Sequence, residues 1–227
     1  MNNNYLTIAL PKGRLGDDAL IRLRCVGYAD VVKTSSRKLI FIDEVKKIRY
    51  MVVKPIDVIT YVEQGVADIG IIGRDNILEE QADLYELLDL GFGKCKFSIA
   101  GKIGEKLYKN DEVLKIATKY PKIAMQYFKQ KEQRIEIIKL NGSVELAPLV
   151  GLSDVIVDIV ETGNTLKANG LEILEDMFDV SAKLISNRVS YRFKYEAIME
   201  LCDLLQNQKE CVYLDSDNKE QRKPIST

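Results

Sequence analysis

The sequence alternates short, β-rich apolar runs with segments that carry helix signals, and this alternation limits the fold more than any other feature. In the first half, the runs YLTIAL, IRYMVV and DIGIIG each have the length and composition of a buried strand, and a helix signal follows each of them. Pro55 opens one such helix and Gly65 closes it, as proline and glycine commonly do. The pattern predicts an α/β protein with mostly parallel strands.

The second half of the chain repeats the pattern. LKIAT, IEIIKL and VIVDIV are predicted strands, and Pro121 begins the helix between the first two. A short helix is expected in GSVELAPLVG, with Ser143 as its cap. LEILEDMF and SAKLISN are expected to pair with each other, as are RKLIFI and IRYMVV. One final helix is expected over residues 191–209, with an apolar face formed by Ile198, Leu201, Cys202 and Leu205.

Length and composition exclude several classes of protein. The chain has 227 residues, 46% hydrophobic and 30% charged, so it can bury a core as one large domain or two small ones. A net charge of −1 gives no reason to expect a nucleic-acid or membrane partner. The stretch MNNNYLTIAL lacks the basic region of a signal peptide, and the four scattered cysteines are expected to be reduced thiols of a cytoplasmic protein.

The chain contains no histidine, which narrows the chemistry that it can perform. Triads, metal sites and general bases that depend on an imidazole are excluded. The remaining catalytic groups are carboxylates, lysines, arginines, hydroxyls, backbone dipoles and a metal ion held by oxygen atoms.

The stretch VIVDIVETGNTL carries the clearest candidate site, because a buried strand runs directly into a small polar loop. Thr162 and Thr165 supply hydroxyl donors, and Gly163 lets an anion approach the backbone, which is the general form of a phosphate cradle. A simple capped turn explains these residues about equally well. Glu161 favours a ligand that also offers hydroxyls, positive charge or Mg²⁺, as a sugar phosphate does. Asp158, inside the strand, needs a partner or a ligand unless it faces solvent.

The segment ELAPLVGLSDVIVDIVETGNTL resembles the signature of the ATP phosphoribosyltransferase family, the first enzyme of histidine biosynthesis. Every fixed element of that signature is present, at Glu145, Gly151, Ser153, Ile156, Asp158, Thr162, Gly163, Thr165 and Leu166. The resemblance continues in ALPKGRL, SSRKLIF, DVITYVEQGVADIGIIGRDNILE, ELLDLGFGKCKF, KIATKYP and ANGLEILEDMFDVSAKLISNRVSY. It covers nearly the whole chain from Leu6 to about Leu205.

The resemblance implies two αβ lobes like those of type II periplasmic binding proteins, with the active site in the cleft between them. We expect residues 1–90 and 182–210 to form the first lobe and residues 91–181 the second, which carries the phosphate loop. Residues 211–227 are expected to be a frayed polar tail. The chain is similar to the short form of the family, which lacks a C-terminal regulatory domain. That form works in a hetero-oligomer with a subunit resembling a histidyl-tRNA synthetase.

The resemblance also implies the reaction and the roles of individual residues. The 5-phosphoribosyl group of phosphoribosyl pyrophosphate (PRPP) is transferred to N1 of ATP with Mg²⁺ as cofactor, and pyrophosphate is released. The residues expected to bind PRPP are Lys12, Glu145, Asp158, Glu161, Thr162, Gly163, Asn164 and Thr165. The expected catalytic residues are Arg14, Arg37 and Glu161, and the expected ATP-binding residues are Lys54, Gly73 and Asp75. Mg²⁺ is expected on the substrate phosphates, with Glu145 or Asp158 as alternative ligands.

Several alternatives remain open at this stage. Lys54 stands where relatives often carry an arginine, and it keeps the charge but loses the bidentate fork. Asp75 is equally well explained as a helix cap, and Arg37 as the solvated end of a strand. For the whole chain, the alternatives are transfer to another base, a two-lobed ligand-binding protein without catalysis, and an assembly subunit that has lost activity.

Overall fold

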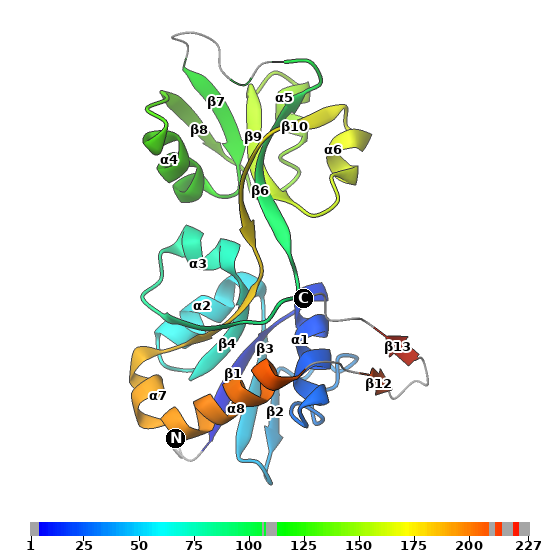
Figure 1. Cartoon of the computed structure of the whole chain (residues 1–227), viewed down its shortest axis with the longest axis vertical. Coiled ribbons are helices and arrows are strands. Elements are labelled where there is room, and N and C mark those ends of the chain that lie inside the picture. The colour runs from blue at the N-terminus through cyan, green and yellow to red at the C-terminus, as the bar shows by residue number, and fades with distance from the viewer. Residues whose placement is uncertain (1–4, 106, 108–112, 209–211, 215–219, 223–227) are drawn as a thin grey trace. The chain divides into compact units, whose positions relative to one another are not determined.

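The computed structural model describes residues 5–105, 107, 113–208, 212–214 and 220–222 (Figure 1). The chain folds into two compact units. Unit 1 comprises Met1–Ile77, Gln81–Gly93 and Ser181–Thr227, and unit 2 comprises Leu78–Glu80 and Lys94–Val180. The domain ranges expected from the sequence stay a prediction.

Unit 1 is built on a six-stranded sheet with the order β2-β3-β1-β4-β11-β5. Its strands are β1 Leu6–Pro11, β2 Ile40–Asp43, β3 Ile48–Val53, β4 Ile69–Gly73, β5 Tyr85–Asp89 and β11 Ala182–Ser186. The central strands β3, β1 and β4 are parallel, whereas β2, β11 and β5 run antiparallel to their neighbours. The predicted antiparallel pairing of β2 with β3 is confirmed.

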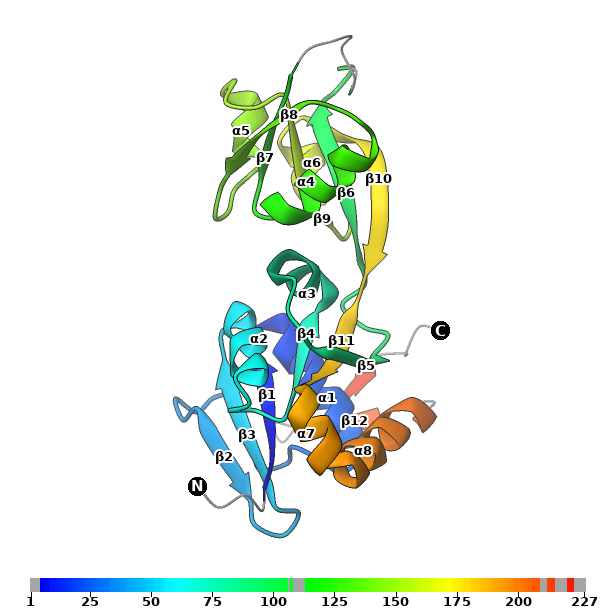
Figure 2. The same ribbon diagram turned by 90° about the vertical axis from the view of Figure 1, so that its left-hand side faces the viewer.

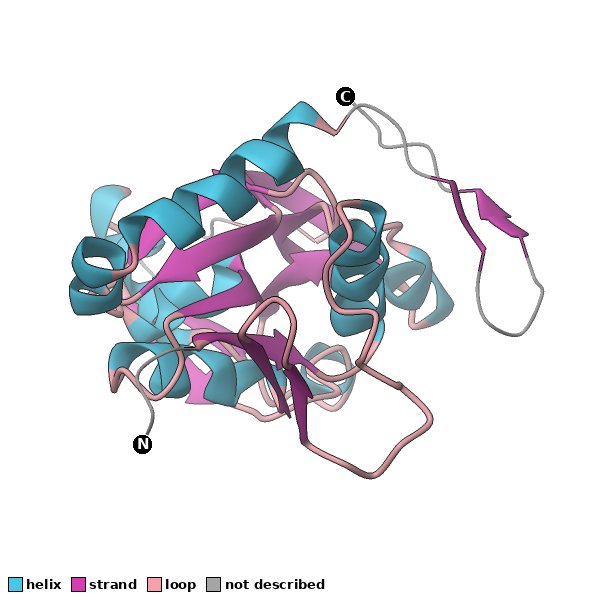
Figure 3. Ribbon diagram, turned by 90° about the horizontal axis from the view of Figure 1, so that it is seen from below, coloured by secondary structure: helices cyan, strands magenta, loops and turns pink. Residues whose placement is uncertain are grey.

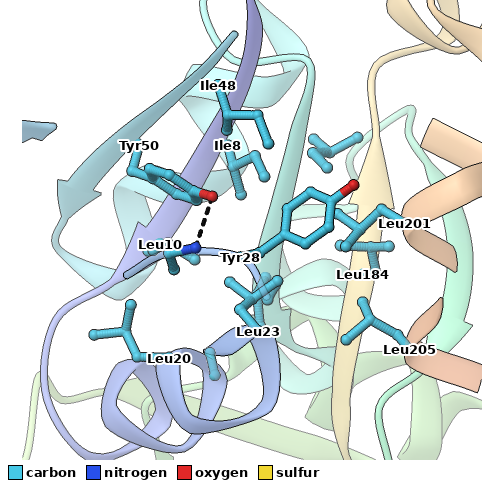
Figure 4. Packing of buried hydrophobic residues seen from close by; sticks show 14 of the residues in the cluster. Ile8, Leu10, Leu20, Leu23, Tyr28, Ile48, Tyr50, Leu184, Leu201 and Leu205 are labelled. Carbon is cyan, nitrogen blue, oxygen red and sulfur yellow. Dashed lines mark hydrogen bonds between the residues drawn. The ribbon is translucent and has the colours of Figure 1, made fainter. Parts of the chain in front are cut away.

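Helices cover both faces of this sheet (Figure 2). They are α1 Arg14–Cys25, α2 Pro55–Glu63, α3 Arg74–Glu80, α7 Arg188–Phe193 and α8 Tyr195–Asn207. Strand β1 serves both faces, since Ile8 and Leu10 pack with α1 and α8 while Ala9 packs with α2. On the first face, the buried Tyr50 hydroxyl accepts a hydrogen bond of 2.8 Å from the backbone N–H of Ala29 (Figure 4).

Unit 2 contains a five-stranded sheet with the order β10-β6-β9-β7-β8. Its strands are β6 Cys95–Lys102, β7 Leu114–Thr118, β8 Ile135–Lys139, β9 Val155–Val160 and β10 Leu171–Val180. Strands β9, β7 and β8 are parallel, and β6 is antiparallel to both β9 and β10. Helix α4, Pro121–Gln130, packs on one face, and α5, Leu146–Leu149, and α6, Asn164–Ala168, pack on the other.

The expected pairing of LEILEDMF with SAKLISN is wrong. Only Ser181 separates β10 from β11, and one extended residue cannot reverse the chain. The two strands therefore follow each other in one direction and join different sheets, β10 beside β6 in unit 2 and β11 between β4 and β5 in unit 1.

Two further expectations about helices need correction. The single final helix is two helices, because Lys194 has a non-helical φ of −123° between α7 and α8. The Asn187 side chain caps α7 by accepting hydrogen bonds from the N–H groups of Val189 and Ser190. Ser143 is not the cap of α5, since Glu145 holds that position without a side-chain cap bond.

The cysteines and the C-terminal tail also differ from expectation. Cys25 is disulfide-bonded, which contradicts the prediction of four reduced thiols, while Cys95 and Cys202 form no disulfide. Within the tail, Val212–Leu214 (β12) and Glu220–Arg222 (β13) pair as a small antiparallel sheet, and the other residues of 211–227 lie outside the described part of the chain (Figure 3). In the described residues, no helix has the length and apolar character needed to cross a membrane.

A buried polar cluster fastens the helices α7 and α8 to the amino-terminal edge of the unit 1 sheet. The carboxylate of Asp68, which is 6% exposed, accepts hydrogen bonds from the backbone N–H of Thr7, the hydroxyl of Ser190 and the ammonium of Lys194. The Lys194 ammonium also donates to the carbonyl of Tyr5 at 2.7 Å. The cluster thus satisfies a charge that would be costly to bury alone.

We expect Lys194→Ala to lower the free energy of unfolding by about 3 kcal/mol, because Asp68 would stay buried without its counter-charge. Lys47→Ala is the matched control, since it removes a pair with Glu44 whose side chains are 52% and 67% exposed, and it should cost less than about 1 kcal/mol. Urea denaturation of both variants measures the difference. Equal small losses would show that the buried cluster contributes no more than a surface pair.

Candidate functional site

The loop Glu161–Gly163 lies at the carboxyl edge of the unit 2 sheet, between β9 and α6. Strand β9 is buried over Val155–Val157 and sits beside the parallel strand β7. Parallel strands end at the same edge, and ligands of α/β proteins bind outside that edge. The predicted phosphate loop is therefore placed where the fold commonly binds ligands.

The backbone of this loop is shaped by Gly163, the N-cap residue of α6. Its φ of +73° is a left-handed conformation that glycine adopts without strain. Thr162 turns its Oγ1 back to the N–H of Asn164 at 3.4 Å, a weak contact. Leu166 buries the other side of α6, which leaves Thr162 and Thr165 exposed. The two hydroxyls and the first N–H groups of α6 can therefore be offered to an anion.

Carboxylates accompany the loop. Asp158 accepts a hydrogen bond from the N–H of Ile159 at 2.8 Å, and its side chain shares a face of β9 with Ile156 and Val160. Glu145 is the N-cap residue of α5, and its neighbour Val144 packs in the same buried cluster as Leu166. The described residues contain no group of three or more Asp, Glu, Cys or His side chains arranged to hold a metal ion.

Three polar residues beside Asp158 were not predicted from the sequence. Ser98 of β6 is the ladder partner of Asp158 on one side and of Asp176 on the other. Asp176 accepts hydrogen bonds from the Ser98 hydroxyl at 2.9 Å and from the Lys96 ammonium at 2.8 Å. The bond from Lys96 has the largest effect on Asp176, and together with the bond from Ser98 it lowers the pKa of that carboxyl group. The bond to Asp176 in turn raises the pKa of Lys96. In the sequence, the alternation of polar and apolar residues in CKFSIA could have indicated a strand with one polar face.

Unit 1 carries cations at the corresponding carboxyl edge. Lys12 follows β1, and its N–H donates to the carbonyl of Val53 at the end of β3. Arg14 is the first residue of α1, and Lys54 is the N-cap residue of α2 directly after β3. All three side chains are exposed. The fold therefore brings Lys12, Arg14 and Lys54 to one edge from two separate turns of the chain.

Arg37 lies at the same edge of unit 1. Strand β2 begins at Ile40, opposite Met51, and the N–H of Val52 donates to the carbonyl of Leu39. Continuing this register places Arg37 opposite Lys54. Arg37 precedes the strand and is exposed, so the fold permits a ligand contact as well as the solvated strand end weighed above.

The junction of β4 and α3 completes the edge of unit 1. Asp75 is 8% exposed and accepts a hydrogen bond from Asn76. A Cβ at residue 73 would lie 2.2 Å from its carboxylate, so Gly73 leaves room for Asp75. The alternative role of Asp75 as helix cap is wrong, because Gly73 is the N-cap and no side-chain cap bond is present. Arg74 instead pairs with Glu86 at 3.4 Å.

The two edges have complementary chemistry. Unit 1 offers ammonium and guanidinium groups, which suit polyphosphate anions. Unit 2 offers hydroxyls, backbone N–H groups and carboxylates, which suit a phosphate attached to a polyol. The individual roles of the residues, and the location of the site between the lobes, stay predictions.

Comparison with solved structures first assigns the chain to a broad class of fold. It resembles the VFT2 domain of Bordetella pertussis BvgS with a TM-score of 0.55 and 11% identity, over 90% of this chain and 93% of that one. It also resembles the alkanesulfonate-binding protein SsuA of Xanthomonas axonopodis with a TM-score of 0.56 and 12% identity, over 90% and 73%. At this identity the likeness concerns the fold alone, that of two-lobed α/β binding proteins, and it confirms the predicted fold class.

The family follows from closer relatives. The family model HisG, ATP phosphoribosyltransferase, matches residues 54–207, and the chain belongs to this family. An ATP phosphoribosyltransferase of Clostridioides difficile is 64% identical over 203 residues, which are 89% of this chain and 98% of that protein. The ATP phosphoribosyl transferase (HisG:HisZ) complex from Thermotoga maritima contains a chain that is 38% identical, with a TM-score of 0.77, over 88% of this chain and 96% of that one.

Family membership confirms the class of activity predicted from the signature. The chain is an enzyme, a phosphoribosyltransferase of the first step of histidine biosynthesis. The relatives are named ATP phosphoribosyltransferases, and this name does not favour the alternatives of transfer to another base or of a binding protein without catalysis.

We expect Gly163→Ala to lower the free energy of unfolding by about 1–2 kcal/mol, because a Cβ is strained at positive φ. Gly163→Asn should cost less, since asparagine tolerates this conformation. Gly142→Ala is the control, because Gly142 has no left-handed φ and open space around its Cβ position, so it should be neutral. Urea titrations compare the three. A neutral Gly163→Ala would show that the loop relaxes without cost.

Proposed function

We propose that this chain transfers the 5-phosphoribosyl group of PRPP to N1 of ATP, giving N1-(5-phosphoribosyl)-ATP and pyrophosphate. The observation that carries the proposal is the complete family signature, with the loop Glu161–Thr165 at the carboxyl end of β9. Hydroxyls, a left-handed glycine and helical N–H groups form a cradle for a phosphate monoester.

Unit 2 binds the sugar phosphate in this proposal. Thr162, Gly163, Asn164 and Thr165 donate to the 5-phosphate of PRPP through hydroxyls and backbone N–H groups. Asp158 and Glu145 accept hydrogen bonds from the ribose hydroxyls. Glu161, on the exposed loop, receives the proton that the adenine ring loses after N1 has formed its bond.

Unit 1 binds the parts that carry the most negative charge. The N1 lone pair of adenine attacks C1 of the ribose while the bond from C1 to the pyrophosphate oxygen breaks. Negative charge then builds on pyrophosphate, and Lys12, Arg14 and Arg37 meet it with fixed positive charge. Lys54, Gly73 and Asp75 bind ATP. Because N1 needs no prior deprotonation, positioning and electrostatics are sufficient for a chain without histidine.

Mg²⁺ is the proposed cofactor. The described residues offer no cage of three carboxylates, so the ion would be held mainly by substrate phosphates, with Glu145 or Asp158 as a protein ligand. Once bound, Mg²⁺ neutralises charge on the pyrophosphate group.

We further propose that the chain works in a hetero-oligomer with a HisZ-like regulatory subunit, one that resembles a histidyl-tRNA synthetase. The similar Thermotoga maritima chain comes from a HisG:HisZ complex. The proposed location is the cytoplasm, where ATP and PRPP are available. No nucleic acid or membrane is needed for the activity.

Product formation tests the proposal directly. ATP, PRPP and Mg²⁺ are mixed with the chain, alone and with a HisZ-like partner, and the absorbance of the N1-ribosylated product is followed. We expect product that depends on both substrates. No product with the partner present, or product with another purine in place of ATP, would contradict the proposal.

We expect Thr162→Ala and Thr165→Ala to weaken PRPP binding about tenfold or more, because each removes a hydrogen bond to a charged phosphate worth roughly 1.5–3 kcal/mol. Calorimetric titration with PRPP measures the loss, and ATP affinity without PRPP should stay the same. If the variants lose thermal stability but bind PRPP normally, the hydroxyls serve only the turn.

We expect Arg37→Ala to lower kcat more than it raises the KM for PRPP, because a charge near the leaving group counts most in the transition state. The expected loss is about 2–4 kcal/mol of transition-state stabilisation. Arg37→Lys should recover part of it, since lysine lacks the fork. Lys33→Ala, which removes another exposed cation of the same segment, is the control. An unchanged kcat would leave Arg37 as a solvated strand end.

A further inference from the structure

Lys96 lies beside the phosphate loop although it is 65 positions earlier in the chain than Glu161. In the antiparallel ladder between β6 and β9, the partner of Lys96 is Val160, the residue that precedes the loop. Side chains of ladder partners stand on the same face of a sheet. Lys96 and Val160 therefore stand together on the face that α5 and α6 partly cover.

Gly163 of the loop lies next to the same residue, Val160. A Cβ built on Gly163 would lie 3.9 Å from a methyl carbon of Val160, so the loop glycine packs against that side chain. Val160 is thus flanked by the loop glycine and, on the next strand, by Lys96. The loop and the lysine belong to the same compact unit, so their arrangement follows from the sheet register alone.

The Lys96 side chain is held in place while remaining accessible. Its ammonium donates to Asp176 at 2.8 Å, and Asp176 is in turn fixed by the hydroxyl of Ser98, which is 1% exposed. The Lys96 side chain is 51% exposed. An ammonium group has three donors and the bond to Asp176 uses one, so two donors are left for a ligand.

We propose that Lys96 is a further binding residue for the 5-phosphate of PRPP. In this proposal the phosphate contacts both the loop Glu161–Thr165, which follows β9, and the ammonium of Lys96 on β6. This rests on the proposed function. The loop supplies neutral donors and one carboxylate, so a cation beside it would add a charge-assisted hydrogen bond to a phosphate dianion. The neighbouring strand β6 provides that cation in Lys96, whose ammonium pairs with Asp176 of β10 and keeps donors for a ligand.

The alternative is an ordinary surface ion pair between Lys96 and Asp176. The preceding residue of β10 provides a matched comparison, since Glu175 pairs with Lys131, which follows α4 on the opposite face of the sheet. Both pairs join a lysine to β10, but only the pair of Lys96 lies on the face that carries the loop. Replacing each lysine separates a binding role from a structural one.

Calorimetric titrations of the full chain with PRPP, ribose 5-phosphate, inorganic pyrophosphate and ATP test the proposal. We expect Lys96→Ala to weaken PRPP and ribose 5-phosphate by the same factor, about tenfold, as expected for loss of one charged hydrogen bond. Pyrophosphate and ATP affinities should not change. Lys96→Arg should restore most of the PRPP affinity, and Lys131→Ala should bind all four compounds like the wild type.

Unchanged PRPP affinity in Lys96→Ala would overturn the proposal, and so would a loss for PRPP without a loss for ribose 5-phosphate. Lys96→Gln repeats the test with a side chain of similar length, and melting temperatures confirm that the variants fold. A wild-type chain that binds neither PRPP nor ribose 5-phosphate would instead refute the proposed function itself.

Discussion

The direction of the central strands determines where this protein can do chemistry. In unit 1, β3, β1 and β4 are parallel, and in unit 2, β9, β7 and β8 are parallel. The chain must leave every one of these strands at the same edge of its sheet, and the turns gathered there carry the polar residues. Segments far apart in sequence, such as those of Lys12, Lys54 and Gly73, are neighbours for this reason alone.

Stability and chemistry are separated between the two edges of the unit 1 sheet. At the amino edge, the buried Asp68 pairs with the partly buried Lys194, and their hydrogen bonds fix α7 and α8 to the first strand. At the carboxyl edge, Lys12, Arg14 and Lys54 are exposed. Buried polar groups with several partners are costly to disturb, whereas exposed cations can exchange water for a ligand. The amino edge of the sheet therefore stabilises the fold, and the exposed cations that can bind a ligand lie at the carboxyl edge.

Much of this architecture could be predicted from the sequence, because β-rich runs, proline starts and the signature loop are local signals. The arrangement of β10 and β11 could not be predicted, because two strands that are close in sequence are expected to form a hairpin. The structure shows that only Ser181 separates them and that they join different sheets. The break at Lys194 was missed because helical periodicity does not reveal a single non-helical residue, and the contact of Lys194 with the distant Asp68 cannot be read from it either. Lys96 was missed for a similar reason, as only the register of β6 with β9 brings it to the loop.

The central claim is that the carboxyl edge of unit 2 binds the sugar phosphate, while the cations of unit 1 bind the pyrophosphate that leaves. Hydrogen–deuterium exchange of the wild-type chain with ribose 5-phosphate and with PRPP and Mg²⁺ tests it most directly. The account predicts that ribose 5-phosphate slows exchange in the peptide containing residues 161–166 and leaves the peptide containing residues 12–14 unchanged, whereas PRPP slows both. Protection of residues 12–14 by ribose 5-phosphate, without protection of residues 161–166, would contradict it.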